Sequence, residues 1–292
     1  MRIISPYTHP QNWLKGNFHT HTNVSDGEDN TKAVIEAYRD DNYDFLAITD
    51  HSVLSGGRTK KAGRMLLLPA QECHVRADSG AFDYHVVGLG LKKQVAGQTS
   101  GQGIIDAISN NGGLAFVSHP RWSFMEYEQF NRLTGYVGFE VYNGVCDKWF
   151  GRGYSNDFWD GWMTERREAV YAVAVDDTHA LRRDFASGWT MVNAKKTPAA
   201  IYDALRRGDA YSSTGPRIET IRVENGTIHA HTSSAKAIKF VSTDGHIAFQ
   251  VEGEHVKSAA FCPKGDEVYV RVEVHGHDGT IAWSNPFFIE GD

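Results

Sequence analysis

Short apolar runs rich in β-branched residues alternate with amphipathic, helix-like segments over roughly the first 210 residues of the chain. This alternation is typical of repeated βα units and predicts an α/β fold. The predicted strands are Gly16–His19, Phe45–Thr49, Met65–Gln71, His85–Leu91, Leu114–Ser118, Val137–Val141 and Val170–Val175. The predicted helices are Thr31–Arg39, Gly103–Asn110, Asp157–Arg166 and Pro198–Arg207.

The segment Pro198–Arg207 carries the clearest helical pattern, because its apolar and small residues repeat along one helix face. Thr197 is suited to the N-cap and Pro198 to the first helical position. Gly208 provides a C-terminal stop. The residues 212–216, Ser-Ser-Thr-Gly-Pro, then read as a boundary.

Beyond this boundary the pattern changes to short alternating runs separated by turn signals such as Asn225-Gly226 and Asp244-Gly245. The predicted strands here are Ile218–Val223, Thr227–His231, Ala237–Ser242, Ile247–Val251, Ser258–Phe261, Glu267–Val274 and Phe287–Ile289. They favour a small β-sandwich of the immunoglobulin-like type. We therefore predict a catalytic domain over residues 1–213 and an all-β domain over residues 214–292.

The composition excludes several classes of protein. The 292 residues are 41% hydrophobic, their net charge is −6, and no run is long and apolar enough to span a membrane. Basic residues are scattered, so no extended nucleic-acid surface is expected. The N-terminal residues lack the pattern of a secretory signal, which predicts a cytoplasmic location. The oligomeric state cannot be predicted from the sequence.

Histidine is unusually frequent, with 14 residues, and neutral imidazole is the commonest metal ligand in proteins. The strongest local signal is His19-Thr20-His21, followed by Ser25-Asp26-Gly27. In an extended strand end, positions i and i+2 project to the same face, so His19 and His21 can address one ion. Asp26 returns to the same region from the following turn. Together these residues predict a site for a divalent ion with nitrogen and oxygen ligands.

The same combination of an apolar run and a metal-binding residue type recurs along the chain. His51 follows 45–48, Glu72 follows 66–70 and His119 follows 114–118, and Asp177 and His179 follow 170–175. In barrel-like α/β folds the C-terminal ends of the strands converge on one mouth, where functional groups gather. His85 differs, because it opens an apolar run instead of closing one.

This ordered set of motifs resembles the polymerase-and-histidinol-phosphatase (PHP) family of metal-dependent phosphoesterases. The motifs are His19-x-His21 with Ser25-Asp26-Gly27, Thr49-Asp50-His51, Glu72, His85, Ser118-His119-Pro120 and Asp177-x-His179, and they span about the first 215 residues. The C-terminal segment, including residues 282–286, looks like that of a branch containing carbaryl-type hydrolases.

The resemblance implies a distorted (β/α)7 TIM-like barrel that holds roughly two to three divalent ions, with zinc, manganese and iron all compatible. It assigns one ion to His19, His21, Glu72 and Asp177, a second to Glu72, His85 and His119, and a third to Asp26, His51 and His179. Asp26 stands where some relatives have histidine. His19, His21, Glu72 and Asp177 would hold the water that acts as the nucleophile.

Metal coordination lowers the pKa of a bound water from about 16 to about 7, which makes hydroxide available near neutrality. Arg121, Arg58 and Trp122 are predicted to contact the substrate, with Arg121 the best candidate for a phosphate contact because it follows His119-Pro120. Four residues beside the ligands are predicted to support them. These are Asp50, Asp176, Glu140 and Asn143.

The leading hypothesis is hydrolysis of a phosphate mono- or diester of a small molecule, of the nucleotide or sugar phosphate class. An alternative is hydrolysis of a non-phosphate ester, such as an aryl carbamate, by the same activated water. A third hypothesis, which the complete ligand set disfavours, is a non-catalytic scaffold whose β-rich C-terminal part binds a sugar or a protein.

Overall fold

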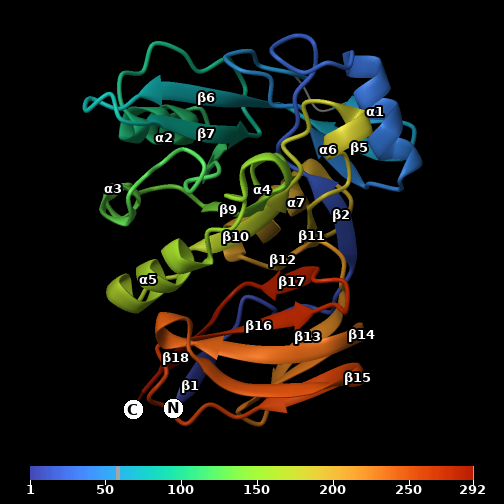
Figure 1. Cartoon of the computed structure of the whole chain (residues 1–292), viewed down its shortest axis with the longest axis vertical. Coiled ribbons are helices and arrows are strands. Elements are labelled where there is room, and N and C mark those ends of the chain that lie inside the picture. The colour runs from blue at the N-terminus through green and yellow to red at the C-terminus, as the bar shows by residue number, and fades with distance from the viewer. Residues whose placement is uncertain (57–59, 292) are drawn as a thin grey trace.

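The computed structural model describes residues 1–56 and 60–291 as a mixed α/β structure built on two hydrogen-bonded sheets (Figure 1). The α-helices belong to the part of the chain before residue 208. The long C-terminal strands form a layer at one end of the molecule, and both termini lie at that end (Figure 1). None of the helices in the described ranges has both the length and the hydropathy to cross a membrane.

The smaller sheet has five strands in the order β10-β9-β8-β7-β6. The strands are β6 (Ala70–Arg76), β7 (Asp83–Leu89), β8 (Leu114–Val117), β9 (Gly138–Asn143) and β10 (Tyr171–Val175). β8, β9 and β10 are parallel, as βα units predict. β7 is antiparallel to both of its neighbours. The prediction of βα units is therefore wrong between β6 and β7, because the six residues 77–82 make a hairpin connection that is too short for a helical crossover.

The larger sheet has 13 strands and runs through both the N-terminal and the C-terminal parts of the chain. Its first part contains β2 (Trp13–Asn17), β3 (Phe45–Ala47), β4 (Lys60–Ala62), β5 (Met65–Leu68), β11 (Trp189–Asn193) and β12 (Ala210–Ser213). β2, β3 and β5 are parallel, and β4, β11 and β12 join in antiparallel pairs. The residues 212–213, expected to mark a boundary, thus belong to a buried strand.

The remaining strands of the larger sheet are β1 at the N-terminus and six strands in the C-terminal part of the chain. These strands are β1 (Arg2–Ile4), β13 (Ile218–Glu224), β14 (Thr227–Ser242), β15 (Ile247–Phe261), β16 (Tyr269–His275), β17 (Ile281–Ser284) and β18 (Phe287–Glu290). β17 pairs with β12, so hydrogen bonds between strands cross the predicted domain boundary. The division at residue 213 stays a prediction.

Two pairs of strands that sequence reasoning separated are continuous in the structure. Thr227–His231 and Ala237–Ser242 both lie in β14, and Ile247–Val251 and Ser258–Phe261 both lie in β15. The pairing register between β14 and β15 shifts at residues 231–237. Such bulges absorb the interruption in the apolar alternation without ending the strand.

The two sheets meet at the strand ends that carry the predicted ligands. Isolated parallel bridges join Thr20 to Thr178 and His51 to Glu72. β6 begins two residues after β5 ends, so the chain passes directly from one sheet to the other. No continuous ladder closes the sheets in the described residues.

The helices are α1 (Thr31–Asp40), α2 (Gly101–Asn110), α3 (Tyr127–Arg132), α4 (Gly144–Phe150), α5 (Asn156–Arg166), α6 (Leu181–Asp184) and α7 (Pro198–Arg207), with a 3-10 turn at Thr243–Gly245. The prediction for α7 is confirmed in its bounds and in both caps. The Thr197 side chain accepts a hydrogen bond from the Ala200 amide, and Gly208 adopts a left-handed conformation with φ of 71°.

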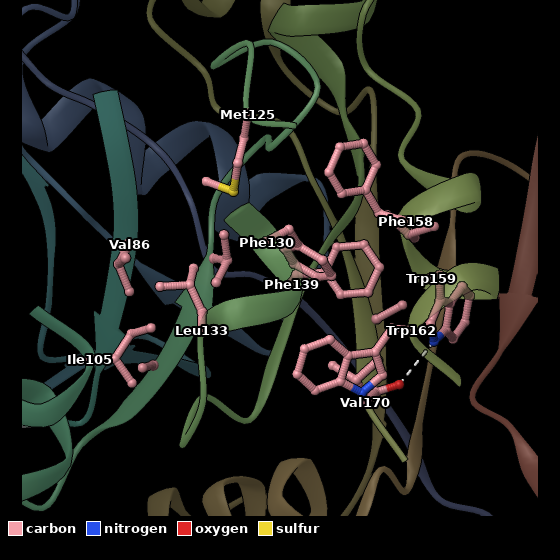
Figure 2. Close-up of a cluster of buried hydrophobic side chains, with 14 of the residues drawn as sticks. Val86, Ile105, Met125, Phe130, Leu133, Phe139, Phe158, Trp159, Trp162 and Val170 are labelled. Atoms are coloured by element: carbon pink, nitrogen blue, oxygen red, sulfur yellow. Dashed lines mark hydrogen bonds between the residues drawn. The ribbon is translucent and has the colours of Figure 1, made fainter. Parts of the chain in front are cut away.

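The largest hydrophobic core lies between the five-stranded sheet and helices α2, α3 and α5. Figure 2 shows Phe130, Phe139, Phe158, Trp159 and Trp162 packed together in this core. The Trp159 ring donates its Nε1–H to the Val170 carbonyl at 2.9 Å, which satisfies the only polar atom that this buried side chain carries. Trp159 and Trp162 are thus core residues, and neither lines the pocket of the candidate site described below.

A buried arginine connects α5 to the C-terminal strands. Arg271 on β16 is 2% exposed and donates to both carboxylate oxygens of Asp160 on α5, at 3.1 and 2.9 Å. It also pairs with Glu273, and its guanidinium lies 5.0 Å from the Trp159 ring centre. The Arg271 cation lowers the pKa of Glu273 to about 2 although burial opposes this.

Asn285, between β17 and β18, contacts the strands of the N-terminal part. Its Oδ1 accepts a hydrogen bond from the Ala172 amide at 2.9 Å. Its Nδ2 donates to the carbonyls of Gly208 and Ala210, both at 3.1 Å. One buried amide side chain therefore holds β10 and β12 in place.

Candidate metal centre

The nine side chains that the sequence predicts as metal ligands converge on one region of the structure, in overlapping groups whose ligand atoms lie within 4.8 Å of one another. They are His19, His21, Asp26, His51, Glu72, His85, His119, Asp177 and His179. His19, His51, His119 and Asp177 lie just beyond the ends of β2, β3, β8 and β10. Glu72 and His85, in contrast, lie inside β6 and β7, so strand-end reasoning does not explain their positions.

Four of these side chains point one ligand atom each at a common centre. The Nε2 atoms of His19 and His21 are 3.1 Å apart. Each of these nitrogens lies 3.2 Å from Oε2 of Glu72 and 3.2 Å from Oδ1 of Asp177. A tetrahedral ion with nitrogen and oxygen ligands about 2.0 Å away holds its ligand atoms about 3.3 Å apart. Five of the six distances among these four atoms are therefore of the size that one small cation requires.

Glu72 faces a second group of imidazoles with its other oxygen. Its Oε1 lies 2.9 Å from Nδ1 of His85 and 3.4 Å from Nε2 of His119. Asp177 behaves similarly, because its Oδ2 lies 3.9 Å from the same His119 nitrogen. Both carboxylates thus have one oxygen toward each group, which is the arrangement that a pair of neighbouring cations requires.

A third group lies at the exposed side of the site. Oδ2 of Asp26 is 3.5 Å from Nε2 of His51 and 3.4 Å from Nε2 of His179. Its Oδ1 is 3.4 Å from Nδ1 of His21. Nδ1 of His179 lies 2.8 Å from the Asp177 carbonyl and donates a hydrogen bond to it, so Nε2 is the nitrogen that a neutral ring would offer to an ion beside Asp26.

The loop that brings Asp26 back to the site depends on Gly27. A Cβ atom at this position would lie 2.9 Å from backbone atoms of His21 and Thr22, closer than such atoms approach. Asp50 stabilises the same loop, because it accepts hydrogen bonds from the Thr22 amide at 2.8 Å and the Ser25 hydroxyl at 3.0 Å. Asp50 therefore positions the loop and not a histidine ring.

Burial and mutual charge set the protonation of the site. Burial opposes a charge on His21, but Asp177 and Glu72 outweigh it and raise the pKa of His21 to about 9. The pKa of His19 is raised by the same two carboxylates and Glu140, again against burial. The imidazoles in turn hold the pKa of Glu72 and Asp177 well below the usual range of carboxyl groups, although burial alone would raise them. Without metal, protons on the imidazoles balance the buried carboxylates.

We therefore expect metal binding to become stronger as the pH rises from about 7 to about 9, at least about tenfold per pH unit, because each ion must displace protons from the imidazoles. Isothermal titration calorimetry in buffers of different ionisation enthalpy would measure both the affinity and the protons released. An affinity that does not change over this range would contradict the raised pKa of His21.

Among the nine candidate ligands, two buried polar atoms have no hydrogen-bond partner of acceptable geometry, namely Oδ1 of Asp177 and Nδ1 of His51. Leaving such atoms unpaired costs about 1–3 kcal/mol each. Both atoms lie 3.2 Å from other ligand atoms at angles unsuited to hydrogen bonds. Shared coordination of a cation satisfies all of these atoms at once, so the donor set fits a metal centre.

The backbone is held in an uncommon conformation at two of the ligands. His119 has φ of 27° and Asp177 has φ of 56°, in the left-handed region that side chains other than glycine rarely adopt. Strain of this kind costs about 1–3 kcal/mol and is concentrated at functional sites. Both side chains face other ligands of the site, His119 toward Glu72 and Asp177 toward His19.

Glu140 and Asn143 of β9, the two residues predicted to support the ligands from this strand, contact them directly. Oε1 of Glu140 lies 2.6 Å from Nδ1 of His19, and Oε2 accepts the His119 amide at 2.9 Å. Asn143 donates to Oε2 of Glu140 at 2.8 Å and to Oδ2 of Asp177 at 3.1 Å. A proton held on Nδ1 of His19 by Glu140 leaves Nε2 free as a ligand.

Replacing Glu140 with glutamine is expected to weaken metal binding about 10- to 100-fold, because the neutral amide holds the His19 ring less firmly and lowers its basicity. Competition with a metal-chelating dye would measure the affinity. Glu128→Gln, at a residue 85% exposed on α3, is the matched control and should bind metal as the wild type does. Equal affinities in both variants would show that Glu140 has no such role.

Asp176 does not contact any of the nine residues with its side chain. It accepts hydrogen bonds from the Tyr38 hydroxyl at 2.7 Å and from the Ser187 and Gly188 amides, both at 2.8 Å. Burial raises the pKa of Asp176 to about 6. Its role is to position the segment that follows β10.

The three residues predicted to contact the substrate are Arg121, Arg58 and Trp122, and only Trp122 is found beside the site. Arg121 is turned away from the site, where it pairs with Asp157 and stacks against Phe158. Its predicted contact with a phosphate stays a prediction, because in this structure the exposed Asp157 carboxylate binds the guanidinium. Arg58 lies outside the described residues. Trp122 lies beside the site, with its ring centre 5.0 Å from that of His119.

Sequence reasoning missed one wall of the pocket. Eight of the nine candidate ligands, all except His19, line a cavity of 270 Å³, whose other lining residues are the predicted Trp122 and, in addition, Val145, Cys146 and Phe150. Three of these belong to α4, which begins directly after β9. α4 has only seven residues and no helical periodicity, so the position after a strand end was the only available signal.

The chain shares its fold with a solved two-domain protein from Bacteroides vulgatus, described as containing a predicted PHP-like metal-dependent phosphoesterase. The two chains are 15% identical, the match covers 97% of this chain and 96% of the other, and the TM-score is 0.55. This level of similarity extends over both the α/β part and the C-terminal strands.

Weaker structural similarity links the chain to an amidohydrolase from Chromobacterium violaceum with bound sulfate and no metal, at 17% identity, 58% and 89% coverage and a TM-score of 0.43. A lesion-specific endonuclease from Pyrococcus furiosus is 12% identical, with 68% and 56% coverage and a TM-score of 0.46. A family model described as a protein of unknown function, DUF3604, matches residues 149–247. No curated protein matches the sequence significantly.

Proposed function

We propose that this protein is a metal-dependent hydrolase that cleaves a phosphate mono- or diester of a small molecule, of the nucleotide or sugar phosphate class. The observation that carries the proposal is the sharing of Glu72 and Asp177 between groups of imidazoles in one pocket. Such shared carboxylates are suited to neighbouring ions that act together on a phosphoryl group. The description of the Bacteroides vulgatus protein, whose fold this chain shares, supports the same reaction class.

Divalent ions bound here would supply a Lewis acid for the phosphoryl oxygens and lower the pKa of a bound water from about 16 to about 7. The chain's own residues determine where this chemistry takes place. Glu140 holds a proton on Nδ1 of His19 and so directs the opposite nitrogen into the pocket. Asn143 fixes the plane of the Asp177 carboxylate. The buried strand ends exclude bulk water from one side of the site.

The finer architecture is part of the same proposal. The bridges Thr20–Thr178 and His51–Glu72 support a distorted barrel in which the two sheets enclose one mouth. We further propose two to three ions of zinc, manganese or iron, in line with the overlapping groups of ligands. The pocket of 270 Å³ favours a small substrate. A cytoplasmic location remains a prediction.

One observation favours the alternative of a non-phosphate ester, such as an aryl carbamate. None of the described residues that line the pocket is lysine or arginine. A phosphate would therefore depend on the metal ions for charge neutralisation, whereas a neutral ester needs no such partner. The non-catalytic scaffold has no observation in its favour.

Parallel assays of metal-loaded protein with p-nitrophenyl phosphate, bis-p-nitrophenyl phosphate and an aryl carbamate would test the proposal, together with elemental analysis. We expect metal-dependent turnover of at least one phosphate ester and its loss in His19→Ala. His229→Ala is the matched control, because His229 begins another His-x-His motif, on strand β14, and this variant should stay active. Turnover of the carbamate alone, or full activity in His19→Ala, would overturn the proposal.

A further inference from the structure

The pocket has two chemically different sides. On one side are the imidazoles and carboxylates of the candidate metal centre, and on the other are Trp122, Val145, Cys146 and Phe150. The Trp122 ring stands edge to face against His119 and His85, with ring centres 5.0 and 6.0 Å away. Phe150 extends this wall, because its ring centre lies 5.9 Å from that of Trp122. An aromatic wall therefore begins in contact with the ligands and leads to the pocket mouth.

The two rings of the aromatic wall, Trp122 and Phe150, are partly exposed to solvent. Phe150 is 56% exposed, and Trp122 is half-buried although both line a concave site. Exposed apolar surface at a pocket is typical of a place where a ligand completes the packing. Burial of the Cys146 thiol beside them raises its pKa, so this side of the pocket carries no charge.

The position of the wall relative to the ligands is fixed by Asn143. Its Oδ1 caps α4 by accepting the Cys146 amide at 3.0 Å, while its Nδ2 donates to Asp177 at 3.1 Å. At the other end of α4, the Trp149 ring donates to Asp184 at 3.1 Å. One amide side chain thus connects the metal ligands to the helix that carries Phe150, so the distance between the two sides is set by the fold.

We propose that the substrate carries an aromatic ring next to the scissile ester bond, attached to the ester oxygen directly or through one carbon, and that Trp122 and Phe150 bind this ring. The proposal rests on the phosphoesterase activity of the proposed function, and it replaces the nucleotide or sugar phosphate class with aromatic phosphate esters. In the reaction, a water oxygen bonds to phosphorus and the bond from phosphorus to the ester oxygen breaks. One proton of the water goes to the departing aromatic alcohol and the other stays with the phosphate.

Benzyl phosphate and ethyl phosphate form a matched pair of substrates, because their alcohols are of similar acidity and differ in the ring. We expect the ratio of kcat/KM for benzyl over ethyl phosphate to fall about tenfold in Phe150→Ala and in Trp122→Leu, through the loss of ring contacts. Phe124→Ala is the control, since Phe124 is 62% exposed and lines the neighbouring pocket instead. Its ratio should equal that of the wild type.

Affinities for benzylphosphonate and ethylphosphonate, which are not hydrolysed, give a readout that does not depend on turnover. The wild type should bind benzylphosphonate more tightly, and Phe150→Ala should lose this preference. Because Trp122 packs against His119, its replacement can also disturb the ligands, whereas the exposed Phe150 can be changed without that effect. Ratios and preferences that are the same in all variants would overturn the ring proposal. Failure of the metal-loaded wild type to hydrolyse any of these phosphate esters, the p-nitrophenyl phosphates included, would overturn the proposed function, while the phosphonate affinities would still decide the question of the ring.

Discussion

Replacing Glu72 with glutamine is expected to lower hydrolysis at least about 100-fold and to reduce the metal content by at least one ion per chain. Glu72 is 1% exposed and faces His19 and His21 with one oxygen and His85 and His119 with the other. Glutamine keeps the size of the side chain, but it has a neutral amide where two groups of ligands need a shared carboxylate. The metal content from elemental analysis and the rate with the best substrate would measure the effect.

The same replacement has a second expected effect in the metal-free protein. Glu72 raises the pKa of both His19 and His21, so these rings should titrate at lower pH in Glu72→Gln. Titration of the imidazoles by nuclear magnetic resonance would show the change. Glu219→Gln is the control, because this residue is half-exposed on the outer strand β13. Full metal content and unchanged activity in Glu72→Gln would rule out a bridging role for this residue.

Replacing Arg271 with methionine is expected to lower the free energy of unfolding by about 3–5 kcal/mol, because it leaves the carboxylates of Asp160 and Glu273 buried without a cation. Chemical denaturation of the wild type and the variant would measure this difference. Arg222→Met is the matched control. Its ion pair with Glu224 is exposed at both partners, so a change below about 1 kcal/mol is expected.

The effect of Arg271 should also depend on pH. The pKa of Glu273 is lowered to about 2 in the folded protein, so the ion pair stabilises the fold above the ordinary carboxyl pKa of about 4 and this contribution is lost as the pH falls toward 2. The difference in stability between the wild type and Arg271→Met should therefore shrink in acid. A difference below about 1 kcal/mol at neutral pH would contradict the view that this pair is needed to neutralise the buried carboxylates.

The convergence of the candidate ligands could be predicted from the sequence, because several of their positions follow from simple geometry. His19 and His21 share one face by strand periodicity, and His119 and Asp177 follow parallel strands that end at the same edge. His85 could not be located in this way. It lies in a strand that runs antiparallel to its neighbours, and only the pairing of β7 with β6 brings it opposite His74 and close to Glu72.

Other features depend on contacts that no local pattern encodes. Arg121 follows His119 closely in the sequence, yet an aspartate 36 positions away determines where its side chain points. α4 is too short for periodicity to reveal it, although it forms the apolar wall of the pocket. In the C-terminal part, two pairs of predicted strands are each one long strand, β14 and β15. Bulges in the pairing between them let each strand continue past the interruption in its apolar pattern.

The hydrogen bonds of Asn285 have a consequence for how the chain can be divided. The Asn285 side chain satisfies the Ala172 amide, in the strand that leads to Asp177, from 113 positions later in the chain, and it satisfies the carbonyls of Gly208 and Ala210 from 77 and 75 positions later. A fragment that ended at residue 213 would expose these groups and would lack β17, one of the two strands that pair with β12. The C-terminal strands thus support the strands that carry the candidate metal centre, and we expect that the gene segment encoding them cannot be exchanged freely.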